Sequence, residues 1–163
     1  MTTNSSSRIP QDFNHLEQIF VSGTRHFYAL LKDINRATHT IELETYLFER
    51  DHLGIRVAEA LSEAAKRGVN VRVMVDGAGS PYWTTNFARM LEKSGASTKV
   101  FHPFPWQLWN WSRSLVKLPM IMRWVYFLLK VNSRNHRKVC IIDNKIAYIG
   151  SFNVSKCHLD QTE

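Results

Sequence analysis

The feature that most constrains the fold of this chain is a regular alternation between short runs of strand character and longer stretches of helical periodicity. Residues 40–48 (TIELETYLF) alternate with the period of two that is typical of a strand. Residues 54–68 place Val57, Leu61 and Ala64 on one helical face and end at a glycine that stops the helix. We expect strands at 19–23, 40–48, 69–77 and 98–102, and helices at 24–39 (capped by Thr24), 54–68 and 83–95.

Strands that alternate with helices of this length predict βα units around a largely buried sheet, so the fold class is α/β. A chain of 163 residues with 44% hydrophobic and 21% charged residues is long enough for one domain with its own core. Two cysteines are too few for a disulfide framework, and Cys140 lies within an apolar strand, where a buried thiol is expected. We therefore take a reducing compartment as the default.

The charge of the chain is concentrated in its second part. Residues 1–100 carry 12 Lys and Arg against 11 Asp and Glu, whereas residues 101–163 carry 9 against 3. A basic surface of this kind attracts phosphate, either in nucleic acid or in anionic lipid headgroups. The first residues, 1–18, contain no apolar run of the kind found in signal peptides and are expected to form a flexible lead-in.

The alternation stops at residues 103–134, a segment that holds four of the five tryptophans and no acidic residue. Lys117, Pro119 and Arg123 interrupt its apolar run, which excludes a membrane span of about 20 residues. Tryptophans and cations beside apolar side chains instead favour the headgroup layer of an anionic membrane. The alternative is an insertion that packs on its own domain or on a partner.

A second constraint on function comes from residues 135–153 (NHRKVCIIDNKIAYIGSFN). In an extended strand, residues two apart share a face, so His136, Lys138 and Cys140 are expected to point the same way. An imidazole can attack phosphorus, and an adjacent ammonium can hold the non-bridging oxygens, without need of a metal or other cofactor. The segment DNKIAYIG then predicts a hairpin with Asn144 in its turn.

The hairpin leads to a group of small and polar residues that suits phosphate binding. Gly150 lets the backbone pass close to a ligand, and the side chains of Ser151 and Asn153 can donate hydrogen bonds to phosphate. Taken singly, His136, Lys138 and Asp143 would be ordinary surface and turn residues. The combination H-x-K-x4-D-x6-G-S-x-N is too specific for that interpretation.

This combination resembles the HKD signature of the phospholipase D superfamily, matched by His136, Lys138 and Asp143 and followed by the glycine, serine and asparagine at 150, 151 and 153. Residues 28–80 are also similar to the N-terminal half of bacterial cardiolipin synthases, which extends the resemblance over residues 20–155. The resemblance implies a phospholipase D-like domain at 19–163 with a mixed β-sheet flanked by helices. It also implies catalytic roles for His136, Lys138 and Asp143, and transfer of a phosphatidyl group through a phosphohistidine.

The chemistry requires a second group that the motif does not supply. Once His136 is bonded to phosphorus, another group of suitable pKa must protonate the departing alcohol. In the superfamily this group belongs to a second HKD motif, in the same chain or in an identical subunit. No second H-x-K occurs in these 163 residues, so we interpret the chain as one half of a two-motif site, apparently truncated.

Two acids elsewhere in the sequence have more than one interpretation. Glu44 occupies a position where the synthases carry a glutamate in an inner strand, and it either orients a site lysine or histidine or lies on the exposed face of an edge strand. Asp76 ends a strand before a glycine, where α/β sites often gather, but we interpret it as a turn residue.

Three functions from different classes follow. The first is a phosphatidyltransferase of cardiolipin synthase type that acts on an anionic, phosphatidylglycerol-like phospholipid at a membrane surface. It would be located in the bacterial cytoplasm or peripherally on the inner membrane. The second is a homodimeric nuclease, and the third is a catalytically silent, lipid-binding half. The apolar residues of the tryptophan-rich segment favour the first, because a nuclease groove does not require them.

Overall fold

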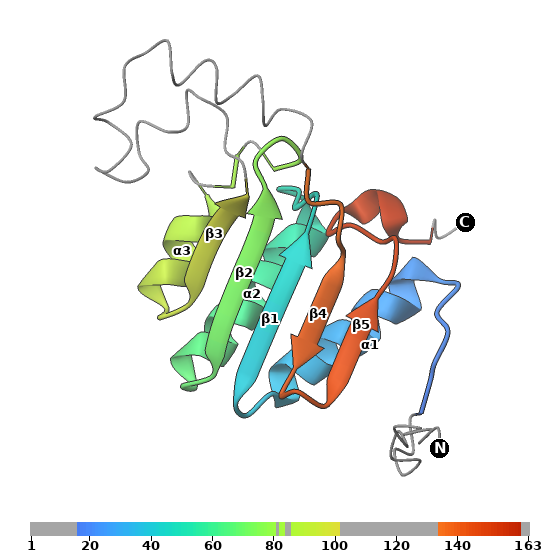
Figure 1. The fold of residues 1–163 in the computed structure, drawn as a ribbon, viewed down its shortest axis with the longest axis horizontal. Helices are drawn as coiled ribbons and strands as arrows, with labels where there is room; N and C mark the ends of the chain where they lie inside the picture. The colour runs from blue at the N-terminus through green and yellow to red at the C-terminus, as the bar shows by residue number, and fades with distance from the viewer. Residues whose placement is uncertain (1–15, 81, 84–85, 102–133, 161–163) are drawn as a thin grey trace, which may run out of the picture.

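The computed structural model describes residues 16–80, 82–83, 86–101 and 134–160, which form one layer of helices against a β-sheet (Figure 1). In chain order the elements are α1 (Gly23–Arg36), β1 (Thr40–Thr45), α2 (His52–Lys66), β2 (Asn70–Asp76), α3 (Phe87–Lys93), β3 (Ser97–Phe101), β4 (Val139–Ile142), β5 (Ile146–Ile149) and the short 3-10 helix η2 (Lys156–His158).

The sheet has five strands in the order β3-β2-β1-β4-β5. Strands β1, β2 and β3 are parallel neighbours, as the two βα units predict, whereas β4 runs antiparallel to β1 and β5 antiparallel to β4. The expected mixed α/β sheet flanked by helices is confirmed. Strand β1 occupies the centre, so both of its neighbours help to fix the residues at its ends.

The core lies between the sheet and its helices. Alternate residues of the two central parallel strands, among them Ile41 on β1 and Val73 on β2, are buried, and Figure 1 shows α1, α2 and α3 on the same side of the sheet. The predicted apolar face of α2 is confirmed, because Val57, Leu61 and Ala64 are all 0% exposed. Removing these side chains from water provides the main driving force for this arrangement.

Local signals set the helix ends. The carboxylate of Asp51 accepts a hydrogen bond of 2.8 Å from the Gly54 amide and caps α2. Gly68 and Gly95 follow α2 and α3 with φ of 91° and 95°, a region that glycine adopts without strain, so both act as the predicted stops.

The strand predicted at 19–23 is wrong. Ser22 caps α1 by accepting a hydrogen bond from the Arg25 amide, so the helix begins at Gly23 and Thr24 is not its cap. Ile19 and Val21 are 88% and 93% exposed and belong to no strand. Residues 19–23 therefore have the apolar composition of a strand, but they pair with no strand of the described structure.

Most of the tryptophan-rich segment 103–134 and of the lead-in 1–18 lies outside the described residues, so their predicted roles stay predictions. Within the described part of the chain, no helix is long and apolar enough to cross a membrane.

Candidate active site

The motif residues other than Asp143 gather where β1 ends and β4 begins. The Gly150 amide donates to the Lys138 carbonyl (3.2 Å), which brings the two parts of the motif side by side. Leu47 and Val154 are joined by a hydrogen bond of 3.1 Å, so the chain beyond Gly150 runs along the chain beyond β1. The site is thus formed by the carboxyl end of β1 and by the end of the hairpin opposite its turn.

His136 is exposed and lies against an aromatic ring. Its imidazole stacks on Tyr46 with ring centroids 4.3 Å apart and an angle of 20° between the planes. An imidazole attacks through a nitrogen lone pair that lies in the ring plane. Contact with one face therefore orients the ring and leaves its reactive edge open.

Lys138 lies beside His136 as the motif predicts. Its Nζ donates to the His136 carbonyl at 2.8 Å and lies 5.4 Å from the centroid of the Tyr46 ring. An ammonium has three donors, so this bond leaves two for a phosphate. The ring and the carbonyl together hold the cation near the imidazole.

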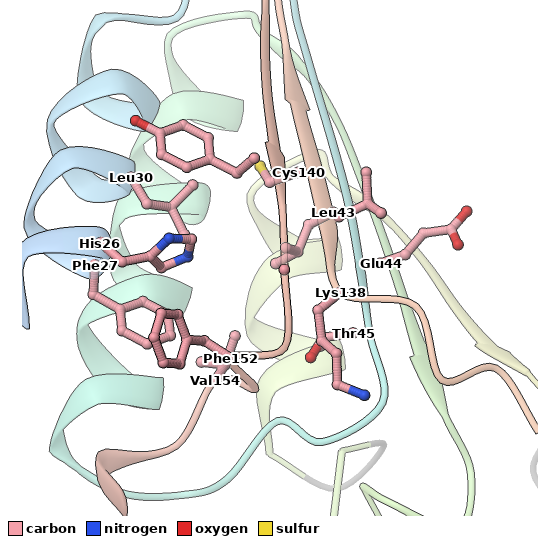
Figure 2. Close-up of a pocket in the computed structure, with 13 residues that line it drawn as sticks. His26, Phe27, Leu30, Leu43, Glu44, Thr45, Lys138, Cys140, Phe152 and Val154 are labelled. Carbon is pink, nitrogen blue, oxygen red and sulfur yellow. The ribbon is translucent and has the colours of Figure 1, made fainter. Parts of the chain in front are cut away.

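A small cavity of about 20 Å³ lies behind Lys138, between the sheet and α1 (Figure 2). It has room for about one water molecule, so any larger ligand would have to bind on the exposed side of the site. Cys140 lines this cavity, and burial raises the pKa of its thiol to about 12. The thiol therefore stays protonated at neutral pH and is not a nucleophile.

Glu44 and Asp76 lie at the carboxyl ends of β1 and β2 and contact the residue before His136. The Asn135 side-chain amide donates to Glu44 (3.2 Å), and its backbone amide donates to Asp76 (3.0 Å). The Arg137 guanidinium lies 4.0 Å from Glu44. Glu44 is on the central strand, not on an edge, and Figure 2 shows its carboxylate on the side of the sheet away from the helices.

The predicted phosphate-binding residues lie next to this group. Asn153 accepts a hydrogen bond from the Leu47 amide at 3.2 Å, and Ser151 is exposed. A Cβ built on Gly150 would meet no atom of the described chain within 4 Å. Packing against the described residues therefore does not require a glycine there.

Asp143 is not brought to the other motif residues. It lies in the turn at the opposite end of β4, where its carboxylate accepts hydrogen bonds from the backbone amides of Thr38, His39 and Thr40 and from the Thr38 hydroxyl. The Thr40 and Thr38 amides hold the pKa of the Asp143 carboxyl well below its usual range. Through these hydrogen bonds, Asp143 connects the hairpin turn to the start of β1.

Sequence patterns did not identify Tyr46 or Asn135 as site residues. Tyr46 follows directly after β1 and continues the alternation of Glu44, but nothing in a single sequence shows that His136 stacks on it. Asp76 stabilises the turn after β2, as predicted, by accepting a 2.8 Å hydrogen bond from the Ala78 amide. It also accepts a hydrogen bond from the Asn135 amide.

Comparison with known families gives a match over most of the chain. A family model described as cardiolipin synthase, PLD-like domain, matches residues 30–163. The cardiolipin synthase of Listeria welshimeri is 35% identical over 159 residues, which is 98% of this chain and 29% of the relative. The major cardiolipin synthase ClsA of Bacillus subtilis is 34% identical over 141 residues, covering 86% of this chain and 26% of the relative.

The chain thus spans less than a third of the length of these curated relatives. Among solved structures, NucT from Helicobacter pylori superposes with a TM-score of 0.56 and 19% identity, covering 85% of this chain and 74% of NucT. At this level of identity the likeness concerns the fold, which the two chains share.

Proposed function

The chain belongs to the family described as cardiolipin synthase, PLD-like domain, and from this membership we propose that it forms one half of a phosphatidyltransferase active site. The substrate would be the phosphodiester of an anionic phospholipid such as phosphatidylglycerol. The observation that carries the proposal is that His136 and Lys138 both contact the Tyr46 ring, beside the Gly-Ser-x-Asn segment at residues 150–153. The cardiolipin synthases that match nearly the whole chain support the choice of a lipid substrate.

In this proposal His136 is the nucleophile. A ring nitrogen attacks phosphorus and forms a P–N bond while the P–O bond to the departing alcohol breaks, and a general acid gives that oxygen its proton. The acceptor hydroxyl then attacks phosphorus, returns its proton to the same group and breaks the P–N bond. Lys138, with Ser151 and Asn153, would hold the non-bridging oxygens during both steps.

The general acid would come from a second H-x-K motif, in a longer chain or in a second copy of this one. For Asp143 we propose a structural role. It would stabilise the hairpin and would not touch the substrate. The enzyme would work peripherally at the inner membrane of a bacterium, where it would meet its anionic phospholipid substrate.

The experiment is headgroup release and lipid transfer with phosphatidylglycerol vesicles, using the full protein that carries this chain. His136→Ala should abolish turnover while leaving the melting temperature unchanged, because the side chain is exposed. His52→Ala, an exposed histidine at the start of α2, is the matched control and should keep full activity. Normal turnover by purified His136→Ala protein would contradict the proposal.

A further inference from the structure

Both polar atoms of the side chain of Asn135, the residue before His136, take part in a hydrogen bond. The Asn135 side-chain amide donates to Glu44 at 3.2 Å, and its side-chain oxygen accepts from the Arg137 amide at 3.2 Å. Its backbone amide donates to Asp76 at 3.0 Å. Asn135 therefore holds the chain on both sides of His136.

The acceptors of these bonds are rigidly placed. Asp76 ends β2, is 0% exposed and lies 3.7 Å from the Arg134 guanidinium, while Glu44 lies near the end of the central strand β1. A buried carboxylate must keep its partners, because leaving it unpaired costs several kcal/mol. The bond from Asn135 to Asp76 is consequently among the firmest connections between this segment and the sheet.

The segment needs such a connection because it lies outside the sheet. Strand β4 begins at Val139, so residues 134–138 form no part of its ladder with β1, and the Gly150 bond reaches only Lys138. The bonds made by Asn135 replace the missing ladder at the point where the imidazole has to be held.

We propose that Asn135 is the positioning residue of His136, which it keeps stacked on Tyr46 through its bonds to Glu44 and to the Arg137 amide. The expected effect on turnover rests on the proposed function, whereas the position of the His136 ring can be measured without any activity. A misplacement of about 1 Å at a reacting group can lower a rate about 10²-fold. Asn135 thus affects turnover without touching the substrate.

The test uses Asn135→Ala, which removes both side-chain bonds but keeps the backbone bond to Asp76, so the fold should be retained. Asn135→Asp keeps the acceptor for the Arg137 amide but places a carboxylate beside that of Glu44. Asn35→Ala, an exposed asparagine in α1, is the matched control.

The first readout is the NMR spectrum of the His136 ring protons, which the stacked Tyr46 ring shifts upfield. Asn135→Ala and Asn135→Asp should move these signals toward those of a free histidine, and Asn35→Ala should not. Exchange of the Arg137 amide with solvent should quicken in Asn135→Ala and stay slow in Asn135→Asp. Unchanged His136 signals in both Asn135 variants would overturn the proposal.

The second readout is turnover with phosphatidylglycerol vesicles. Both Asn135 variants should lower kcat about tenfold or more and leave KM within about twofold, because positioning acts on the reacting group and not on lipid binding. An equal kcat in wild type and variants would overturn the proposal. If the wild type itself transfers no lipid, the proposed function fails, and the NMR readout still decides whether Asn135 positions His136.

Discussion

The charge of Lys138 acts in both chemical steps of the proposed reaction, where it holds the non-bridging oxygens, and contributes little to the binding of the whole lipid. Lys138→Met keeps an unbranched side chain as long as the aliphatic part of lysine and removes the ammonium, whose Nζ lies 2.8 Å from the His136 carbonyl oxygen. We expect kcat to fall about 10²-fold or more, the scale for losing a preorganised charge donor, with vesicle binding nearly unchanged. Steady-state kinetics and vesicle sedimentation measure the two effects. A loss confined to vesicle affinity would contradict this role.

The Tyr46 ring contacts both His136 and Lys138, and we expect the ring without its hydroxyl to be sufficient for turnover. Tyr46→Phe keeps the stacked face and should retain activity within about twofold. Tyr46→Ala removes the stacking and the contact with the Lys138 ammonium, together worth about 1 kcal/mol, so turnover should fall about fivefold or more. Kinetics of the two variants give the answer, and equal losses would point to the hydroxyl instead of the ring.

At the scale of elements, the hairpin of β4 and β5 is tied to β1 at its turn by Asp143. The depressed pKa of Asp143 means that its ionised form stabilises the fold above the unfolded pKa of about 3.9, and that this stabilisation is lost as the pH falls toward the folded pKa. Asp143→Asn suits the φ of 52° at this position and removes the charge together with one of the two oxygens that accept hydrogen bonds from residues 38–40.

The expected result is a lower urea midpoint for Asp143→Asn at pH 7, and a difference from the wild type that shrinks below about pH 4. Urea denaturation between pH 7 and pH 3 measures it. A difference that is constant across this range would show that the carboxylate charge is not responsible.

A close approach of two backbone segments sets the position of Tyr46. A Cβ on Gly79 would lie 2.1 Å from the Tyr46 carbonyl oxygen, whereas a Cβ on Gly150 would meet no described atom within 4 Å. Gly79→Ala should therefore destabilise the fold by about 1–3 kcal/mol, as overpacking does, and Gly150→Ala by less than about 0.5 kcal/mol. Chemical denaturation of both variants compares them directly. Similar losses would argue against the contact.

The elements themselves could be predicted where periodicity extends over several turns or residues, as in α2 and β2. The wrong strand prediction at residues 19–23 has a local cause. The Ser22 hydroxyl accepts a hydrogen bond from the Arg25 amide and so starts a helix within the predicted strand. The place of β4 beside β1 depends on pairing across about 100 residues, which alternation along the chain does not encode. For the same reason His136 and Lys138 could be predicted from their spacing, but Tyr46 and Asn135 could not.

At the scale of the whole molecule, the choice between lipid and nucleic acid depends on where the charge and the aromatic residues lie. The excess of 9 Lys and Arg over 3 Asp and Glu falls in residues 101–163, together with the tryptophan-rich segment 103–134. Both substrate classes attract cations, so charge alone does not separate them. Salt does separate them, because apolar burial in a membrane persists when charges are screened, whereas binding to nucleic acid rests mainly on counterion release.

We therefore predict that the protein sediments with anionic vesicles and that rising salt weakens this binding only in part. Replacing Trp109, Trp111 and Trp124 by Ser should release it, since tryptophan contributes the contact with the headgroup layer. Tyr28→Ser, at an aromatic residue of α1 that is 72% exposed, is the matched control and should sediment like the wild type. The measurement is vesicle co-sedimentation across a salt series with a DNA titration alongside. Equal vesicle binding by wild type and triple variant, together with tight and steeply salt-sensitive DNA binding, would replace the lipid substrate by a nucleic acid and the half-site by a dimeric nuclease.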